Sequence, residues 1–262
     1  MTGRRLRALC TVAAVTALLA GCGDDGADAP GTAAPGAPSG AVTVLAAASL
    51  TESFTRIGKD FEAANPGTTV TFSFGGSAAL ATLITSGAPA DVFAAASPAT
   101  MKTVTDAGDA SGTAQVFARN QLVIAVPKGD PKGIRSLTDL TAPGLKVAIC
   151  AAQVPCGAAA RTALDAARVA LTPVTLEQDV RAALSKLTLG EVDAALVYRT
   201  DVRAAAAKVD AVEFPESAGA VNDYPIAALR DAPNPTGAKA FVDYVRGTQA
   251  AAVLAGAGFQ QP

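Results

Sequence analysis

The stretch VTVLAAASLTESFTRI, residues 42–57, passes from one kind of secondary structure to another within a few residues. Its first half, up to Ala48, is a short apolar run that is typical of a strand buried on both faces. Its second half places Leu50, Phe54 and Ile57 at helical spacing. A buried strand followed directly by an amphipathic helix is the repeating unit of α/β folds. This stretch therefore predicts that the chain is built from such units.

The rest of the sequence continues the alternation. We expect further strands where short β-branched or apolar runs occur, at 68–74, 91–95, 121–126, 145–149, 192–198, 209–214 and 224–229. We expect helices between them, including 157–169 and 179–189, and a helical remainder up to about residue 256. Alternating strands and helices indicate parallel sheets covered by helices on both faces. The length of 262 residues suits two such lobes.

The first residues indicate export rather than fold. Arg4, Arg5 and Arg7 precede an apolar stretch that ends at Leu19-Ala20-Gly21-Cys22. This arrangement looks like a bacterial lipoprotein signal peptide, residues 1–21, which leaves a lipid on Cys22. An uncleaved membrane anchor is the alternative, and the apolar stretch is short for it. We therefore expect an extracytoplasmic protein anchored to the cell membrane, with residues 22–40 as a flexible tether.

The cysteines and the absence of histidine limit the kinds of functional site that the chain can contain. Cys150 and Cys156 remain after the signal, in a compartment where disulfides persist, so a disulfide is favoured over two buried thiols. The chain has no histidine, which excludes Ser-His and Cys-His nucleophilic sites and metal sites that use histidine. A formal net charge of −2 and the lack of basic runs argue against nucleic acid as a partner.

Two serines follow predicted strands at the start of predicted helices. Ser49 has Glu52 three residues later, the spacing of a capping box. Ser77 follows two glycines, which allow the backbone to approach a ligand closely. Free backbone N–H groups at helix starts attract anions, and ligands of α/β sheets bind beyond the carboxyl ends of strands. Either serine alone is also compatible with an ordinary helix cap.

Three features of the second half of the chain have the same character. The turn VPCG, residues 154–157, and the segment EQDVR, residues 177–181, each precede a predicted helix, and Tyr198 ends a predicted strand with a phenol. Each can be explained by itself as a tight turn, a capped helix or a packed aromatic side chain. Together with the two serines they predict a site made of uncharged hydrogen-bond donors.

These stretches together resemble the molybdate-binding proteins of ABC transporters, from about residue 42 to residue 259. The matching segments are AAASLTESF, GGSAALATLI, SGAPADVFAAAS, VPCGAAA, EQDVRAAL, ALVYRTD, YPIAAL and GTQAAAVLAGAGF. The resemblance implies the type II periplasmic binding protein fold: two lobes, each a mostly parallel sheet flanked by helices, joined by two hinge strands. Lobe 1 would comprise 41–119 and 225–262, lobe 2 would comprise 120–224, and the hinges would lie near 120–126 and 224–229.

The same resemblance implies a set of ligand-binding residues. Ser49 and Ser77 would bind the anion from one lobe through side-chain and backbone groups. The backbone amides of Cys156 and Val180 and the hydroxyl of Tyr198 would bind it from the other lobe. The chain departs from the family where glycines rather than serines precede Ser77, and where Cys156 replaces a frequent alanine. A backbone donor tolerates both changes.

The implied function is that of a monomeric, extracytoplasmic solute-binding component of an importer. It would capture molybdate between its lobes and deliver it to a membrane permease that is driven by an ATPase. No cofactor, no free metal cation, no catalytic residue and no nucleic acid are expected. A pocket of donors alone would reject hydrogenphosphate, whose proton needs an acceptor, whereas only pocket size separates molybdate from sulfate.

Other functions are compatible with parts of the sequence. A protein of the same fold that binds tungstate, sulfate or another oxyanion is the nearest alternative. An enzyme with Cys156 as nucleophile, or with Ser49 paired to a lysine, is disfavoured by the missing histidine bases. The effector domain of a transcription regulator is disfavoured by the export signal and by the lack of an upstream DNA-binding helix pair.

Overall fold

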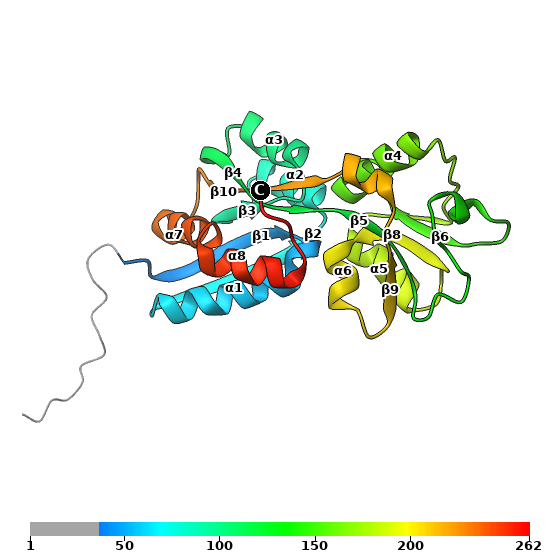
Figure 1. Ribbon diagram of the computed structural model, residues 1–262. Coiled ribbons are helices and arrows are strands. Elements are labelled where there is room, and N and C mark those ends of the chain that lie inside the picture. Colours follow the sequence, from blue (N-terminus) through cyan, green and yellow to red (C-terminus); the bar gives the residue numbers. More distant parts are fainter. Residues whose placement is uncertain (1–36) are drawn as a thin grey trace, which may run out of the picture. The chain divides into compact units, whose positions relative to one another are not determined.

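The computed structural model of the chain describes residues 37–262 (Figure 1). The predicted signal peptide at 1–21, the predicted lipid site Cys22 and most of the predicted tether lie outside the described residues. The first strand, β1 (Gly40–Ala47), begins one residue before the predicted start of ordered structure at Ala41. None of the helices within residues 37–262 is long and apolar enough to span a membrane.

Lobe 1 is built on a five-stranded sheet in the order β2-β1-β3-β10-β4. Parallel pairing joins β1 to β2 and to β3, whereas β10 runs antiparallel to both of its neighbours. The remaining strands are β2 (Thr68–Gly75), β3 (Val92–Ala94), β4 (Ala110–Asn120) and β10 (Asn222–Leu229).

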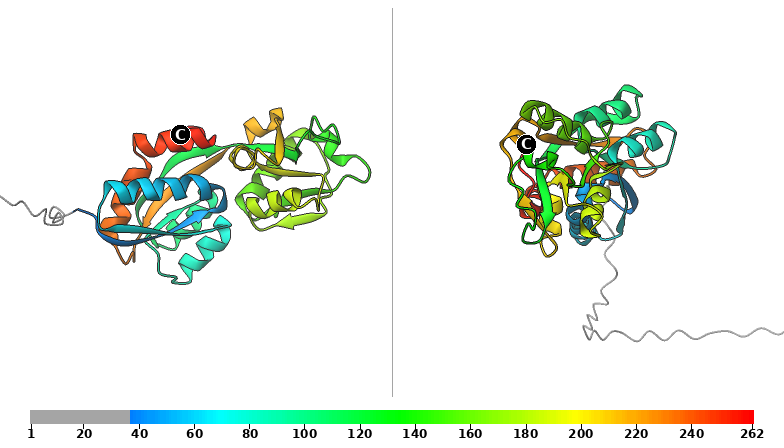
Figure 2. Two further views of the ribbon diagram at one scale, coloured as in Figure 1. Left: turned by 90° about the horizontal axis from the view of Figure 1, so that it is seen from below. Right: turned by 90° about the vertical axis from the view of Figure 1, so that its right-hand side faces the viewer.

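The alternation of side chains along β1 gives lobe 1 a core on each face of its sheet. Val42, Val44 and Ala46 face one core, and Leu45 faces the other. The first core is covered by α1 (Thr51–Ala64), α7 (Pro235–Val245) and α8 (Thr248–Ala257), and the second by α2 (Ser77–Thr85) and α3 (Pro98–Asp106). Figure 2 shows these helices on opposite sides of the sheet.

Lobe 2 repeats this plan with the order β7-β6-β8-β5-β9. Here β6 pairs in parallel with β7 and β8, and β5 is antiparallel to β8 and β9. The strands are β5 (Leu122–Pro127), β6 (Val147–Cys150), β7 (Thr175–Glu177), β8 (Ala194–Tyr198) and β9 (Val209–Val212). The helices are α4 (Pro155–Ala167), α5 (Val180–Thr188) and α6 (Arg199–Ala204), with short 3₁₀ turns η2 (Thr138–Thr141) and η3 (Pro215–Gly219).

The chain crosses between the lobes at two adjacent places. The first crossing is Gln121, which separates β4 in lobe 1 from β5 in lobe 2. The second precedes β10, where the chain returns from η3 to lobe 1. Asn222 pairs with Asn120, so the two crossing segments lie side by side at the boundary (Figure 1). A boundary with only two neighbouring connections is the arrangement that permits hinge motion.

The two sheets are mixed, whereas the sequence predicted mostly parallel sheets. The strands next to the crossings, β10 and β5, run antiparallel to strands of the βαβ units.

The sequence did not predict β4, β7 or α6. In β4 the residues between 111 and 115 are mostly polar or exposed, and the pairing with β10 carries two register shifts, so no period-two pattern marks the strand. Its pairing with β10, whose residues lie 102 to 119 positions later in the chain, is what makes it a strand.

Truncation of a core leucine in lobe 2 tests this packing. Leu122 is fully buried at the start of β5, whereas Leu189 at the end of α5 is 73% exposed. We expect Leu122→Ala to lower the free energy of unfolding by about 2–5 kcal/mol and Leu189→Ala to change it by less than about 0.5 kcal/mol. Urea unfolding followed by circular dichroism measures both. Equal effects of the two variants would contradict the described core.

Candidate functional site

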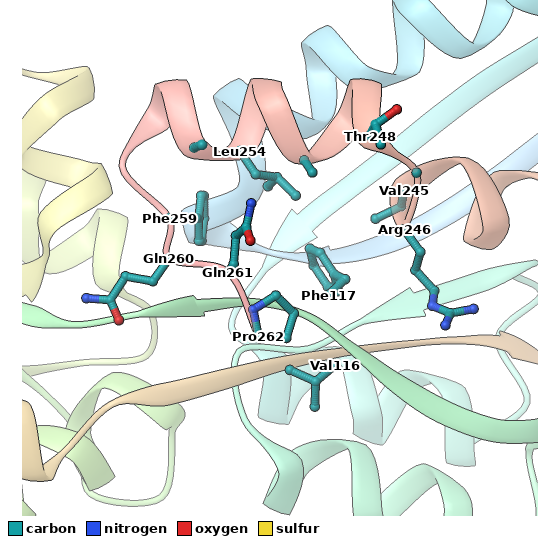
Figure 3. A pocket seen from close by; sticks show the side chains of 13 residues that line it. Val116, Phe117, Val245, Arg246, Thr248, Leu254, Phe259, Gln260, Gln261 and Pro262 are labelled. Carbon is teal, nitrogen blue, oxygen red and sulfur yellow. The ribbon is translucent and has the colours of Figure 1, made fainter.

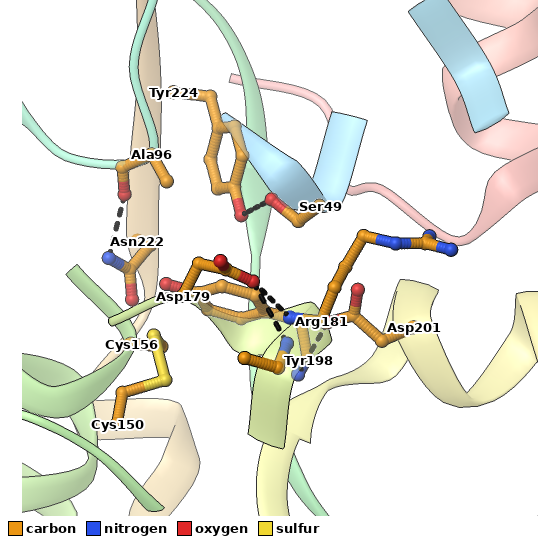
Figure 4. The surroundings of a disulfide bond; sticks show 11 residues. Ser49, Ala96, Cys150, Cys156, Asp179, Arg181, Tyr198, Asp201, Asn222 and Tyr224 are labelled. Carbon is orange, nitrogen blue, oxygen red and sulfur yellow. Dashed lines mark hydrogen bonds between the residues drawn. A yellow bond between two sulfur atoms is a disulfide. The ribbon is translucent and has the colours of Figure 1, made fainter. Parts of the chain in front are cut away.

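A small cavity at the lobe boundary brings together all five residues that the sequence suggested. Ser49 and Ser77 line it from lobe 1, and Cys156, Val180 and Tyr198 line it from lobe 2. Each of the five is at most 5% exposed. Figure 4 shows Ser49, Cys156 and Tyr198 within this region. The remaining lining is provided by Ala47, Ala48, Gly75, Gly76, Ala96, Val154, Pro155, Gln178 and Asp179.

The cavity is small and the lobes are closed around it. The space open to the centre of a water-sized sphere is about 20 Å³. A single water needs about 10–15 Å³ of such space. Across the boundary, the Arg181 guanidinium of lobe 2 pairs with the Glu52 carboxylate of lobe 1. In this arrangement the cavity has room for one compact guest, and a sugar or a peptide would not fit.

Ser49 lies in the 3₁₀ turn η1 (Ala48–Leu50) between β1 and α1. Its side chain does not cap α1, and Glu52 bonds to Arg181 instead, so the predicted capping box is wrong. The Ser49 Oγ lies 2.8 Å from the Tyr224 hydroxyl oxygen. This long-range bond replaces the local one because β10 places a buried phenol beside η1.

Ser77 is the first residue of α2, and Gly76 before it is the N-cap. The Ser77 Oγ accepts a hydrogen bond of 3.0 Å from the backbone N–H of Ala96. Because that oxygen accepts from an N–H, its own proton remains available to a guest. The backbone N–H of Ser77 belongs to the first turn of the helix, and residues 37–262 provide it with no acceptor.

Cys156 lies in the first turn of α4, whose first residue is Pro155. Within the described residues its backbone N–H has no protein acceptor. A disulfide joins Cys156 to Cys150 at the end of β6 (Figure 4). The bond ties the carboxyl end of a strand to the following helix start, and so holds the Cys156 amide at the cavity.

Val180 is the first residue of α5, and Asp179 is its N-cap. One carboxylate oxygen of Asp179 accepts from the backbone N–H groups of Arg181 and Ala182, at 2.9 Å each. The Val180 N–H is left without a protein acceptor in the described part of the chain. Asp179 therefore occupies two helix donors and leaves the first one for the cavity, although its charge also lies in the cavity wall.

Tyr198 ends β8, and its hydroxyl is buried without a hydrogen-bond partner among the described residues. An isolated buried hydroxyl is costly, so it marks a place where a partner binds. Burial raises the pKa of the Tyr198 phenol well above its usual value, so the group stays a donor. The backbone N–H of Tyr198 donates to the buried Asp201 carboxylate, which fixes the end of the strand.

The site is therefore rich in donors and poor in charge. It contains no lysine or arginine in its lining, and Asp179 is its one charged residue. Four helix starts converge on it, at η1, α2, α4 and α5, and each brings partial positive charge. Oriented neutral donors of this kind bind an anion. In the part of the chain that the structure describes, no cluster of three or more acidic, cysteine or histidine side chains could hold a metal ion.

A roomier hollow of about 290 Å³ lies elsewhere, between α8, the C-terminal residues and β4 (Figure 3). Its wall includes Phe117, Leu254 and Phe259, with Arg246 at the edge (Figure 3). Buried donors do not converge there, because the polar groups of Arg246 and Thr248 belong to exposed residues. We therefore locate the site at the lobe boundary.

Two lobes, two crossing segments and a donor-lined cavity between the lobes define a solute-binding protein of the periplasmic type. The comparison with known families agrees. Residues 42–260 match the family model described as bacterial extracellular solute-binding protein, so the chain belongs to this family.

Curated relatives extend over nearly the whole chain. The molybdate-binding protein ModA of Mycobacterium tuberculosis is 45% identical over 247 residues, which is 94% of this chain and 95% of that protein. The Bacillus subtilis protein YvgL, named as a substrate-binding lipoprotein of an ABC transporter, is 30% identical over 83% of this chain and 85% of its own length.

Solved structures show the same fold at lower identity. The periplasmic molybdate-binding protein of Azotobacter vinelandii superposes with a TM-score of 0.72 at 21% identity, covering 84% of this chain and 99% of that one. The sulfate-binding protein SubI of Mycobacterium tuberculosis gives a TM-score of 0.74 at 21% identity, covering 84% and 86%. At this identity the likeness concerns the fold alone.

Two residues next to the site were not singled out from the sequence. Asn120 and Tyr224 are 1% and 0% exposed, and Tyr224 contacts Ser49 directly. Both were expected only as parts of hinge strands. An aromatic residue inside an apolar strand has no local signal for the partner of its hydroxyl, so sequence patterns could not reveal this contact.

A methyl group at Gly76 is expected to interfere with closure. A Cβ atom there would lie 2.4 Å from the backbone oxygen of Gln178 in the other lobe, whereas a Cβ at Gly75 would meet only the Leu80 side chain at 3.7 Å. Neither glycine has a positive φ, so alanine fits both backbones. We expect Gly76→Ala to weaken anion binding at least tenfold, about 1.4 kcal/mol, and Gly75→Ala to change it by less than threefold.

Isothermal titration of the two alanine variants with the anion that the wild type binds makes the comparison direct. Urea unfolding of both variants serves as the control for folding. Unchanged affinity in Gly76→Ala would show that the close contact between Gly76 and Gln178 is not part of the bound state.

Buried Asp201 is expected to make stability depend on pH near neutrality. Burial raises the pKa of this carboxyl from 3.8 to about 7, despite the hydrogen bond from Tyr198 N–H. Between these values the folded chain holds a proton that the unfolded chain has lost, so stability falls as pH rises from about 4 to 7. The full loss is up to about 4 kcal/mol, since one pKa unit corresponds to about 1.4 kcal/mol.

Asp201→Asn keeps an oxygen for the Tyr198 N–H and removes the titration. Urea unfolding between pH 5 and 8 should therefore show a steeper decline for the wild type than for Asp201→Asn. Asp165→Asn, at an exposed position on α4, is the matched control and should behave like the wild type. Parallel curves for wild type and Asp201→Asn would contradict the assignment.

Proposed function

We propose that this chain is the molybdate-binding component of an ABC importer. Ser49 and Ser77 bind the anion from lobe 1, and the Cys156 amide, the Val180 amide and the Tyr198 hydroxyl bind it from lobe 2. The observation that carries the proposal is the buried Tyr198 hydroxyl, which faces a cavity of helix starts and has no partner within residues 37–262. The 45% identity to a molybdate-binding protein supports the choice of anion.

Five or more hydrogen bonds are sufficient to bind an anion tightly without a lysine or arginine side chain in the cavity wall. A hydrogen bond to a charged group contributes about 1.5–3 kcal/mol net. Five or more of them, less the freedom that the anion loses on binding, reach about −8 kcal/mol, which corresponds to micromolar affinity. The Asp179 charge opposes binding, and its two helix N–H partners offset part of that repulsion.

The same donors discriminate among anions by their protons. Molybdate, tungstate and sulfate carry no proton at neutral pH, whereas hydrogenphosphate needs an acceptor in the site. Among the proposed ligand groups, the two amides only donate, the Tyr198 phenol keeps its proton to donate, and both serine oxygens already accept from or contact other groups. The Asp179 carboxylate in the cavity wall is the one strong acceptor, and one of its oxygens already accepts from two helix N–H groups. Sulfate is excluded only by size, because its oxygens lie closer to the central atom than those of molybdate.

Closure of the lobes is the mechanism of capture. The crossing segments at Gln121 and before Asn222 act as hinges, and the anion completes the contacts that join α2 to α4 and α5. The Glu52–Arg181 pair adds little to closure, because both side chains are about half exposed. The closed form then docks on a permease that is driven by an ATPase, and the anion is released there.

The protein acts outside the cytoplasm as a monomer held at the membrane by a lipid on Cys22. The basic residues, the apolar stretch and the Leu19-Ala20-Gly21-Cys22 sequence support this location. A relative that is 30% identical over 83% of this chain, YvgL, is named as a lipoprotein. Each methylene of a buried acyl chain contributes about 0.8 kcal/mol to anchoring.

The site performs no catalysis in this proposal. The Cys156 sulfur is bonded to Cys150, so it is not a standing nucleophile. The chain contains no histidine base, and no lysine lines the cavity.

Titration of the purified protein with four anions tests the proposal. Isothermal calorimetry at pH 7 should show micromolar or tighter binding of molybdate, similar binding of tungstate, weaker binding of sulfate and none of hydrogenphosphate. Ser77→Ala should weaken the free energy of molybdate binding by about 1–3 kcal/mol, which is the contribution of one donor to a charged group. Tight sulfate binding without molybdate binding would sink the proposed ligand.

Ser53→Ala is the matched control for Ser77→Ala. Ser53 is 3% exposed, and its hydroxyl donates to the carbonyl of Leu50 within the first turn of α1, outside the cavity wall. We expect the Ser53→Ala variant to bind molybdate with the same Kd as the wild type. Equal Kd values for Ser77→Ala and the wild type would remove Ser77 from the site.

A further inference from the structure

A chain of buried hydrogen bonds leads from lobe 2 through both crossing strands to Ser49. The Asn120 Nδ2 at the end of β4 donates to the Thr200 Oγ1 in α6 at 2.8 Å and to the Tyr224 hydroxyl oxygen in β10 at 3.4 Å. The Tyr224 hydroxyl lies 2.8 Å from the Ser49 Oγ (Figure 4). All four residues are at most 5% exposed, so water does not compete with these bonds.

The orientation of the Asn120 amide determines the direction of every proton in this chain. Its Oδ1 accepts from the backbone N–H of Gln121 at 3.0 Å, and a backbone N–H can only donate. The amide nitrogen must therefore face Thr200 and Tyr224, and an amide nitrogen can only donate as well. The Tyr224 oxygen is consequently an acceptor toward Asn120.

Tyr224 then has a single proton to donate. The Tyr198 hydroxyl is also a neighbour of this phenol, but it makes no hydrogen bond within residues 37–262, whereas the Ser49 Oγ lies 2.8 Å away. Burial raises the pKa of this phenol far above neutrality, so the proton stays on the oxygen. It is donated to the Ser49 Oγ, the remaining partner at hydrogen-bond distance. The Ser49 oxygen accepts that proton, and its own O–H is left to point at the cavity that Ser49 lines.

We infer that Asn120 and Tyr224 are positioning residues that hold the Ser49 hydroxyl as a hydrogen-bond donor toward the anion. The inference rests on the proposed function, because it concerns the same cavity. It explains how a hydroxyl, which can equally accept or donate, has its proton left free to be donated to the guest. It also makes a proton-free tetrahedral oxyanion the favoured guest at this corner of the site.

The placement of the two residues connects this polarity to the hinge. Asn120 and Tyr224 belong to the two strands that meet at the crossing, and Thr200 lies two residues after Tyr198 in lobe 2. The Asn120 amide therefore contacts both lobes. Because the backbone N–H of Gln121 at the crossing fixes the orientation of this amide, the direction of the Ser49 proton is set within the hinge strands themselves.

A double-mutant cycle between Ser49→Ala and Tyr224→Phe tests the inference. Calorimetric Kd values are measured for wild type, both single variants and the double variant with molybdate, tungstate and sulfate. For the anion that binds tightest, we expect Ser49→Ala to raise Kd about 10–150-fold and Tyr224→Phe to raise it about tenfold. In the Ser49→Ala background, Tyr224→Phe should add less than twofold, because the hydroxyl it orients is gone.

Tyr244→Phe is the matched control, since Tyr244 lies on α7 away from the cavity wall and should keep the wild-type Kd. Urea unfolding without anion reports whether Tyr224→Phe is folded. If it is not, Asn120→Leu replaces it in the cycle, with the same expected loss of effect in the Ser49→Ala background. A purely structural role of Tyr224 would instead give equal factors in both backgrounds.

The outcomes separate the inference from the proposed function. If the wild type binds at least one of the three anions and the effects of Ser49→Ala and Tyr224→Phe multiply, the inference is wrong and the function stands. The same holds if Tyr224→Phe leaves the wild-type Kd unchanged. If the wild type binds none of the anions, the proposed function fails, and the inference fails with it.

Discussion

The structure depends on hydrogen-bond donors that are buried at the lobe boundary and left without protein partners. The first-turn N–H groups of Ser77, Cys156 and Val180 and the hydroxyl of Tyr198 all have this character among residues 37–262. Burying such groups costs free energy unless something accepts from them. An acceptor-rich guest would remove this cost, so the donors themselves specify the chemistry of the proposed ligand.

The arrangement of the two lobes follows from this requirement. Each lobe contributes helix starts at the carboxyl ends of its strands, and neither lobe alone surrounds an anion. The Cys150–Cys156 disulfide and the Asp179 cap fix the lobe 2 donors relative to their own strands. The two crossing segments then have only to bring two preformed half-sites together. Because rigid half-sites are joined by a narrow hinge, binding of the anion shifts the protein toward the closed form.

Much of the fold could be predicted from local patterns. Apolar runs identified β1, β5 and β8, and alternating β-branched and aromatic residues identified β2. Helices were predicted from Ser77, from 157 and from 179, and they begin at Ser77, Pro155 and Val180. The patterns failed where pairing is non-local. The strand β4 lacks alternation and is held by β10, and Ser49 bonds to Tyr224, 175 residues away, rather than capping α1. The antiparallel halves of both sheets were missed for the same reason.

The sequence by itself determined the α/β architecture, the exclusion of histidine chemistry and the residue types that donate at the helix starts, because each of these is written in composition or short-range spacing. The tertiary structure alone decided that the five donors share one cavity, that Gly76 meets Gln178 across the boundary and that Asn120 and Tyr224 direct the Ser49 proton. The contacts of Gly76 with Gln178, of Asn120 with Tyr224 and of Tyr224 with Ser49 join residues 102, 104 and 175 positions apart in the chain. The direction of a shared proton is set only when both partners are in place.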